Sequence, residues 1–173
     1  MTEGSGLQYT RCMTIYLAAD HGGFKLKEEV KKYLQAQCQN VVDCGNETYQ
    51  SDDDYPDFVL KAAQLVARNP ESRSIIFGGS GQGEVMVANR VKGVRCMLFY
   101  GPVVAKEALD IKGKKSSDPF ELLRTSRIHN DSNMLSLGAR FLSTEDALMA
   151  VKIWLETPFP AEERHLRRIK KFN

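Results

Sequence analysis

The sequence lacks paired cysteines, since none of its four cysteines, Cys12, Cys38, Cys44 and Cys96, stands in a Cys-x-x-Cys motif. Such pairs are typical of structural zinc sites and of redox motifs, so neither is predicted. The sequence also lacks an apolar run of about 20 residues, the length that spans a bilayer, and its first residues do not resemble a targeting segment. These absences predict a reducing, cytoplasmic setting and no membrane partner.

The chain also lacks an excess of one charge, with 24 Lys and Arg residues against 22 Asp and Glu. A balance of this kind gives no reason to expect a nucleic acid as partner. Positive charge gathers locally in residues 164–171, Arg-His-Leu-Arg-Arg-Ile-Lys-Lys, which we predict to be a helix that follows Pro160. This helix offers either a solvated basic face or a binding site for an anion.

The length of 173 residues and the hydrophobic content of 42% fit one globular domain. We predict a flexible leader at residues 1–12, which has nothing to bury, and a single domain at 13–173. Apolar runs predict strands at 14–19, 41–44, 74–77, 94–99 and 134–137. Helical periodicity predicts helices at 24–37, 56–69, 82–91, 103–111 and 144–156. The polar, lysine-rich segment 110–125 contains a glycine and a proline, and we predict a surface loop there.

Strands that alternate with helices predict an α/β fold, with an open five-stranded parallel sheet and helices on both of its faces. In such sheets, ligands bind beyond the carboxyl ends of the strands. Asp20 and His21 follow the first predicted strand, and the glycine-rich segment 78–84 follows the third. We therefore expect both segments at the same functional edge of the sheet.

The segment 78–84, Gly-Gly-Ser-Gly-Gln-Gly-Glu, combines a glycine-rich loop with an acidic residue at the start of a predicted helix. Free N–H groups in such a loop suit a phosphate or a developing oxyanion, and the Glu84 carboxylate beside them could move a proton. The alternative is a tight turn whose glycines supply positive φ angles, with Glu84 as an acid favoured by the helix dipole.

Five short motifs follow one another along the chain: Ala19-Asp20-His21-Gly22-Gly23-Phe24, Asp54-Tyr55-Pro56, Gly79-Ser80-Gly81-Gln82-Gly83, Ala88-Asn89 and Arg127-Ile128-His129-Asn130-Asp131. Their order and spacing resemble those of the ribose-5-phosphate isomerase B and galactose-6-phosphate isomerase family, from about residue 14 to 169. The resemblance implies an aldose–ketose isomerase of phosphorylated sugars that uses no metal or cofactor. It also implies a Rossmann-like three-layer α/β/α fold and a homodimer or homotetramer with a shared active site.

The resemblance assigns roles to the matched positions. Asp20 and His129 would open the furanose ring, and Asn130 would bind a sugar hydroxyl or the enediolate. Tyr55 would border the pocket, or it packs at a helix start. Charge on the substrate oxygens would be stabilised by Ser80 and by the amides of Gly79, Gly81, Gln82 and Gly83. Phosphate donors would be His21, Arg140, Arg164 and Arg168, the last two from a C-terminal helix that packs on a neighbouring subunit.

The sequence departs from the family at the proton-transfer position. Many members carry a cysteine where this chain has Gly78, and they use its thiolate to move the proton between the first two sugar carbons. The chain resembles the branch in which a glutamate after the loop, here Glu84, takes that role. Burial that raises the pKa of a carboxyl toward neutrality makes it a workable base.

Interconversion of ribose 5-phosphate and ribulose 5-phosphate through a cis-enediolate is the first hypothesis. Isomerisation of allose or galactose 6-phosphate is the second, and a non-catalytic sugar-phosphate-binding protein is the third. A dinucleotide-binding dehydrogenase is disfavoured because the glycine loop follows the third strand and lacks an acidic ribose anchor. The loop at 110–125, longer than in typical members, could cover the pocket, select the sugar, mediate assembly or be a tolerated insertion.

Overall fold

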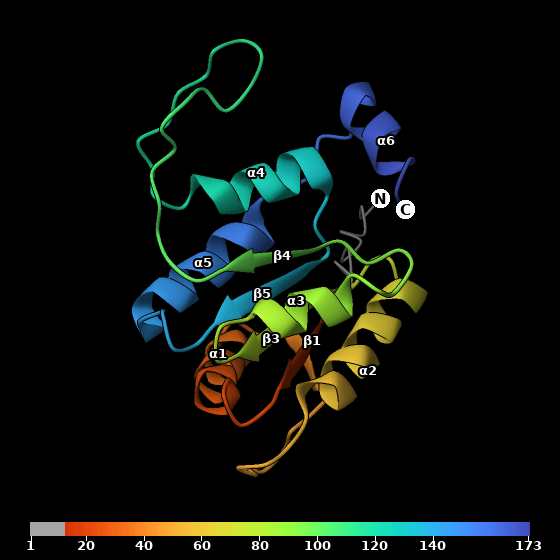
Figure 1. Cartoon of the computed structure of the whole chain (residues 1–173), viewed down its shortest axis with the longest axis vertical. Helices are drawn as coiled ribbons and strands as arrows, with labels where there is room; N and C mark the ends of the chain where they lie inside the picture. The colour runs from red at the N-terminus through yellow and green to blue at the C-terminus, as the bar shows by residue number, and fades with distance from the viewer. Residues whose placement is uncertain (1–12) are drawn as a thin grey trace, which may run out of the picture.

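The computed structural model describes residues 13–173, so the predicted leader and Cys12 lie outside the described residues. Five strands form one sheet in the order β2-β1-β3-β5-β4, and each pairing is parallel, as predicted (Figure 1). The strands are β1 (Thr14–Ala19), β2 (Asn40–Asp43), β3 (Arg73–Gly78), β4 (Cys96–Phe99) and β5 (Met134–Gly138).

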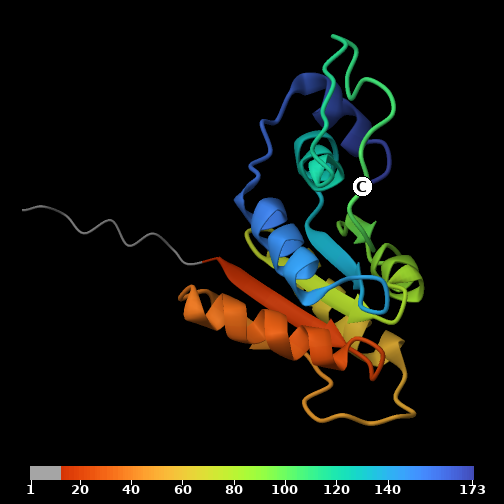
Figure 2. The ribbon, with the colours of Figure 1, turned by 90° about the vertical axis from the view of Figure 1, so that its left-hand side faces the viewer.

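Helices cover both faces of the sheet, which confirms the predicted three layers (Figure 2). They are α1 (Phe24–Ala36), α2 (Tyr55–Arg68), α3 (Gln82–Ala88), α4 (Glu121–Asn130), α5 (Thr144–Glu156) and α6 (Glu163–Ile169). Side chains alternate along β1, so that Ile15 and Leu17 pack in a core with α1, α4 and α5. Tyr16 and Ala18 pack in a second core with α2 and α3.

The predicted helix at 103–111 is wrong. Residues 101–120 form an irregular segment, and the helix in this part of the chain is α4, which begins at Glu121 inside the predicted loop. An amphipathic helix needs a face to bury, but Val103, Val104 and Ile111 are all exposed. The predicted loop is confirmed only for residues 110–120. The last part of the predicted loop, residues 121–125, instead forms the first turn of α4.

The connections after β1 create a crevice at the carboxyl edge of the sheet. β2 and β3 lie on opposite sides of β1, so the chain reverses its direction across the sheet between β1 and β3. At such a switch point the loops after neighbouring strands diverge and leave room for a ligand. Within residues 13–173, no helix combines the length and the apolar character needed to cross a membrane.

Candidate active site

The carboxyl edge of the sheet brings together most of the predicted site residues. Asp20 follows β1, and its Oδ1 accepts hydrogen bonds from the N–H groups of Gly22 and Gly23 at 2.9 and 3.2 Å. Gly79 lies so close to the Arg140 guanidinium that a Cβ added to it would stand 3.1 Å from the Arg140 Cζ. The Arg140 N–H also donates to the Gly79 carbonyl oxygen at 3.0 Å. The turns after β1, β3 and β5 therefore meet at one site.

Residues of the glycine loop also contact α2 and β5. A Cβ on Gly83 would lie 2.7 Å from the Tyr55 Cζ, so the tyrosine ring packs directly against the loop. The Gly81 carbonyl oxygen accepts a hydrogen bond of 2.8 Å from the Ser136 hydroxyl of β5. Ser80 and Gln82 are exposed at the open side, where the Gln82 N–H donates to the Ser80 Oγ at 3.3 Å.

Glu84 occupies the space that a side chain at residue 78 would take. A Cβ built on Gly78 would stand 1.8 Å from the Glu84 Oε1 and 2.0 Å from its Cδ. Only a glycine at 78 therefore leaves room for this carboxylate, which is 4% exposed. Burial raises the pKa of Glu84, and the negative charge of Asp20 adds to that rise. The result is a carboxylate with a higher affinity for a proton than an exposed glutamate has, as a general base requires.

A cationic cleft of about 400 Å³ adjoins the glycine loop. Its walls include His21 after β1, Lys25 of α1, Tyr49 of the β2–α2 loop and Arg140 after β5. The His21 Nδ1 is 2.8 Å from the Asp53 Oδ1, and this hydrogen bond raises the pKa of His21 despite the opposing effect of desolvation. Three potential cations around one cleft suit the two negative charges of a phosphate.

Asp20, His21 and Asp53 form the one group of side chains among residues 13–173 whose geometry could hold a metal ion, with their potential ligand atoms within 4.8 Å of one another. Internal hydrogen bonds account for this cluster. The Nδ1 of His21 and a backbone N–H both bind the Asp53 Oδ1, and two amides bind the Asp20 Oδ1. The cluster therefore forms without any need for a metal to hold its side chains together.

The remaining predicted residues lie at the opposite edge of the sheet. His129 and Asn130 end α4, just before the amino end of β5. β5 separates them from Arg140 by the length of a strand, roughly 15 Å. The His129 ring stacks on His165 of α6, with centroids 4.4 Å apart. One chain therefore places His129 and Asn130 away from Glu84.

The C-terminal helix forms as predicted, and it lies beside His129 rather than beside Glu84. Arg164 and Arg168 are four residues apart in α6 and share a face of that helix. Arg164 borders a recess of about 110 Å³ together with His129, and Lys112 and Lys114 of the irregular segment line the same recess. The polar loop thus adjoins this second group of predicted site residues.

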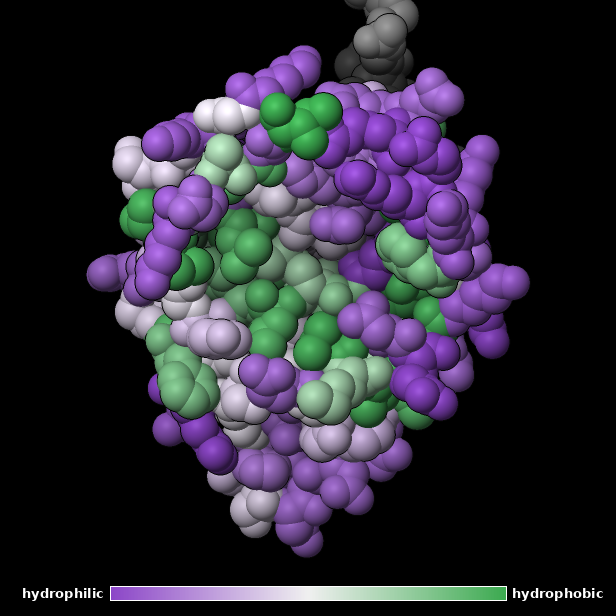
Figure 3. Space-filling view, turned by 45° about the horizontal axis from the view of Figure 1, so that its top comes forward, coloured by the Kyte–Doolittle hydropathy of each residue, from purple (hydrophilic) through white to green (hydrophobic). Residues whose placement is uncertain are grey.

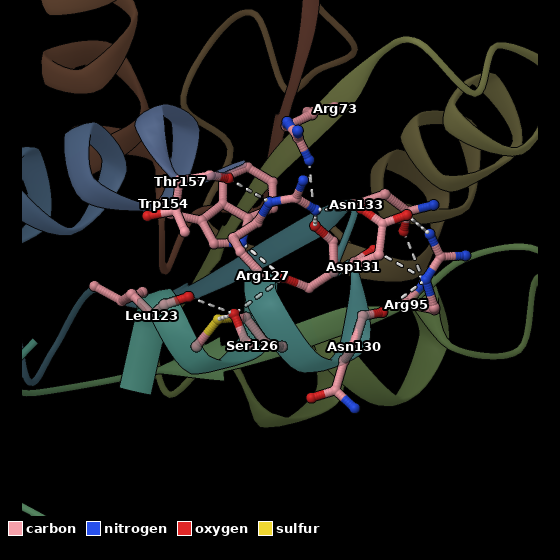
Figure 4. A network of polar contacts seen from close by, with 12 residues as sticks. Arg73, Arg95, Leu123, Ser126, Arg127, Asn130, Asp131, Asn133, Trp154 and Thr157 are labelled. Atoms are coloured by element: carbon pink, nitrogen blue, oxygen red, sulfur yellow. Dashed lines mark hydrogen bonds and ion pairs between the residues drawn. The ribbon is translucent and has the colours of Figure 1, made fainter. Parts of the chain in front are cut away.

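A buried polar network holds the end of α4 in place (Figure 4). The Asp131 carboxylate accepts hydrogen bonds of 2.8 Å from both Arg127 and Arg95, and the Arg95 Nε also donates to the Asn130 carbonyl oxygen at 2.9 Å. Asp131 ends the helix in the left-handed conformation, with φ at 45°. The Asn130 side chain points away from this network and is free to contact a ligand or partner (Figure 4).

Asp131→Ala is expected to lower the free energy of unfolding by about 2–4 kcal/mol, measured by urea denaturation. Arg127, whose side chain is 2% exposed, would lose its charged partner, and alanine is disfavoured at positive φ. Glu29→Ala is the control, because it removes an exposed ion pair with Lys32 that is worth about 0.5 kcal/mol at most. Equal effects of the two changes would contradict the structural role of the network.

Two residues of the site escaped the sequence analysis. Asp53, which holds His21, is the middle member of the acidic run Asp52-Asp53-Asp54, and nothing in one sequence distinguishes it from its neighbours. His165, which stacks on His129, sits between the basic residues of α6. Its buried position could be found from the helical spacing to Ile169, four residues later, which is also buried.

The comparisons with known proteins agree with this geometry. A family model described as Ribose/Galactose Isomerase matches residues 15–113 and 119–172. The unmatched residues 114–118 lie in the polar loop. The ribose-5-phosphate isomerase B of Mycobacterium tuberculosis is 35% identical over 157 residues, which cover 91% of this chain and 86% of that protein. The protein of the same name from Mycolicibacterium paratuberculosis is 34% identical over 157 residues, covering 91% of this chain and 87% of the relative.

Solved structures give the same result at the level of the fold. The ribose 5-phosphate isomerase B of Thermotoga maritima superimposes with a TM-score of 0.78 at 34% identity, covering 92% of this chain and 97% of that one. The Mycoplasma genitalium enzyme with bound ribulose-5-phosphate gives a TM-score of 0.78 at 31% identity, covering 92% and 93%. The glycine loop, the sheet order and the extent of these matches have one explanation, which is that the chain belongs to the ribose/galactose isomerase family.

Proposed function

We propose that the protein interconverts ribose 5-phosphate and ribulose 5-phosphate. The observation that carries the proposal is the Glu84 carboxylate, which fills the space left by Gly78 beside the glycine loop. The relatives named as ribose-5-phosphate isomerase B, and the solved relative with bound ribulose-5-phosphate, support this choice of sugar. Sugar phosphates are charged and do not cross membranes unaided, which favours a cytoplasmic location.

In the proposed mechanism, Glu84 takes the proton from C2 of the open-chain aldose. The electron pair of that C–H bond forms the C1–C2 double bond of a cis-enediolate. The electron pair of the C1=O π bond moves onto O1 at the same time. Ser80 and the amides of Gly79, Gly81, Gln82 and Gly83 stabilise the negative oxygen. Return of the proton to C1, together with transfer of the O2 hydroxyl proton to O1, gives the ketose, and no other reactant is required.

Binding and ring opening use the other predicted residues. His21 and Arg140 hold the phosphate in the cationic cleft, and the charge of Asp20 acts on both His21 and Glu84. Tyr55 packs on the glycine loop and borders the substrate. In the proposed site, His129 and Asp20 open the furanose ring and Asn130 binds the enediolate.

His129 and Asn130 reach the substrate only if a second copy of the chain supplies them. An apolar hollow lies over the edge strand β4, between α3 and α4 (Figure 3). The exposed Leu122 lines it, Met86 of α3 is also exposed, and β4 itself is half-buried over most of its length. An uncovered apolar edge strand of this kind marks an interaction surface.

Twofold symmetry about this hollow brings the two groups of residues together. α3 begins on the left below β4, and α4 ends on the right above it, next to α6 (Figure 1). The twofold axis would lie in this face, pass through the centre of the hollow and run perpendicular to the line that joins these two corners. A 180° rotation about it exchanges the corners, so that Glu84 of one copy faces His129 of the other. Arg164 and Arg168 would then join the phosphate site from the same neighbouring α6. We therefore propose a homodimer, alone or within a tetramer, with two shared sites.

Turnover of three sugar phosphates tests the proposed function. With a chelator present, ribose 5-phosphate is expected to be converted at least about tenfold more efficiently than allose 6-phosphate or galactose 6-phosphate, since an ill-fitting carbon unit costs about 1–3 kcal/mol. A preference for a six-carbon sugar would support the second hypothesis. Binding of all three sugars without turnover would favour the non-catalytic binder.

A further inference from the structure

We infer that Asp53 is a positioning residue for phosphate recognition, because it fixes the His21 ring so that Nε2–H is presented to the cationic cleft. This inference rests on the proposed function. The Asp53 Oδ1 lies 2.8 Å from the His21 Nδ1 and accepts a second hydrogen bond of 2.8 Å from the His21 backbone N–H. A carboxylate can only accept, so Nδ1 must carry a proton. The opposite ring nitrogen, Nε2, is left for the cleft that His21 lines.

Asp53 is itself held rigidly. Its side chain is 4% exposed, and its second oxygen, Oδ2, accepts a hydrogen bond of 2.8 Å from the Asn46 Nδ2. The Asn46 backbone is fixed in turn, since its N–H donates to the Ala19 carbonyl oxygen at 2.8 Å and its own carbonyl accepts from the Lys27 Nζ at 2.6 Å. Lys27 is completely buried and paired with Asp43. A chain of contacts thus ties the His21 ring to α1 and to the end of β1.

The charge of Asp53 also decides what His21 can bind. A neutral imidazole with its proton on Nδ1 has a lone pair on Nε2, which repels a phosphate oxygen, whereas an imidazolium donates from both nitrogens. The hydrogen bond to Asp53 is the largest cause that raises the pKa of His21, and the charge of Asp20 adds to it. Phosphate binding is therefore expected below this raised pKa and is lost as the pH increases through it.

Other charged groups around His21 do not replace Asp53. Lys25 and Glu29 of α1 face the same cleft with opposite charges, and Arg140 faces it from the loop after β5. The Asp20 Oδ2 is 3.9 Å from the His21 Nδ1, too far for a hydrogen bond. Asp53 is thus the group that sets the tautomer and contributes most to the charge.

Nitrogen-15 NMR of the histidines in the wild-type full chain tests the tautomer without any change to the site. The His21 signals are assigned from their loss in His21→Gln. Above its pKa, neutral His21 is expected in the Nδ1–H form, the minor form of free histidine. Inorganic phosphate at pH 7.5 is expected to shift the His21 Nε2 signal. An Nε2–H tautomer in the wild type would overturn the inference, and this result does not depend on enzymatic activity or on any variant folding.

Asp53→Asn separates positioning from mere structural support. We expect a lower His21 pKa and a KM for ribose 5-phosphate about tenfold above that of the wild type at pH 7.5. The ratio of the two KM values should shrink to below about threefold at pH 5.5, where an ordinary imidazole is already protonated. Titration of the substrate phosphate cancels in this ratio. Asp52→Asn, at an exposed neighbouring position, is the matched control.

The outcomes separate this inference from the proposed function. An unchanged His21 pKa in a folded Asp53→Asn chain, or a KM ratio that is the same at both pH values, would overturn the positioning role. Failure of the wild type to convert ribose 5-phosphate, with the Nδ1–H tautomer and the phosphate shift intact, would contradict the proposed reaction alone.

Discussion

Glu84→Gln is expected to lower the kcat for ribose 5-phosphate by about 10³-fold, measured with an assay for ribulose 5-phosphate formation. The amide keeps the size of the side chain, which fits the space beside Gly78, but it cannot accept and return a proton. KM should change little, because the proposed phosphate site is the cleft around His21 and Arg140. Retention of full turnover by this variant would refute the role of Glu84 as the base.

The spatial exclusion between residues 78 and 84 provides a control for this prediction. A Cβ at residue 78 would overlap the Glu84 carboxylate, so Gly78→Cys alone should displace that carboxylate and reduce activity. In the double variant Gly78→Cys/Glu84→Ala, the thiol would occupy the vacated space. Partial recovery relative to Glu84→Ala would show that the position of the base matters more than its chemical type.

The raised pKa of Glu84 also fixes the direction of the pH dependence. Burial disfavours the charged form of this carboxyl, so its pKa lies above the ordinary 4.5. The base is active only when ionised, and activity is therefore lost as the pH falls through that raised pKa. The acid limb of the kcat profile reports this group in the substrate complex.

The sequence predicted the sheet well because buried parallel strands are read as continuous apolar runs. All five strands occur where such runs were found, and the carboxyl edge holds Asp20, His21 and the glycine loop as expected. The irregular segment and α4 were misjudged for the opposite reason. α4 buries Arg127 and Ser126 as well as Leu123, so its inner face shows no apolar periodicity.

The division of the site into two groups was only partly predictable. The motif order placed His129 and Asn130 in the site, and the resemblance assigned α6 to a neighbouring subunit. A sequence, however, does not show that α4 ends at the amino edge of β5, which separates His129 from Glu84. That fact depends on the chain direction of α4 across the sheet, which is set by tertiary packing against α5 and α6.

The proposed shared site leads to a complementation test with a large expected effect. One chain carries Glu84→Gln, and the other carries His129→Ala and Asn130→Ala. Each homodimer is expected to be nearly inactive. A heterodimer, isolated by two different affinity tags after coexpression, combines one doubly damaged site with one intact site. It should therefore show about half of the wild-type activity.

A heterodimer with all three substitutions on one chain and none on the other is the matched control, because the two arrangements predict opposite results. If the sites are shared, each site of this control contains one damaged half, and activity should be nearly absent. If each chain forms its own site, the control keeps one intact chain and about half of the activity, whereas the first heterodimer has none. The pair of measurements thus decides whether His129 and Asn130 act across the β4 hollow, independently of the absolute rate of either variant.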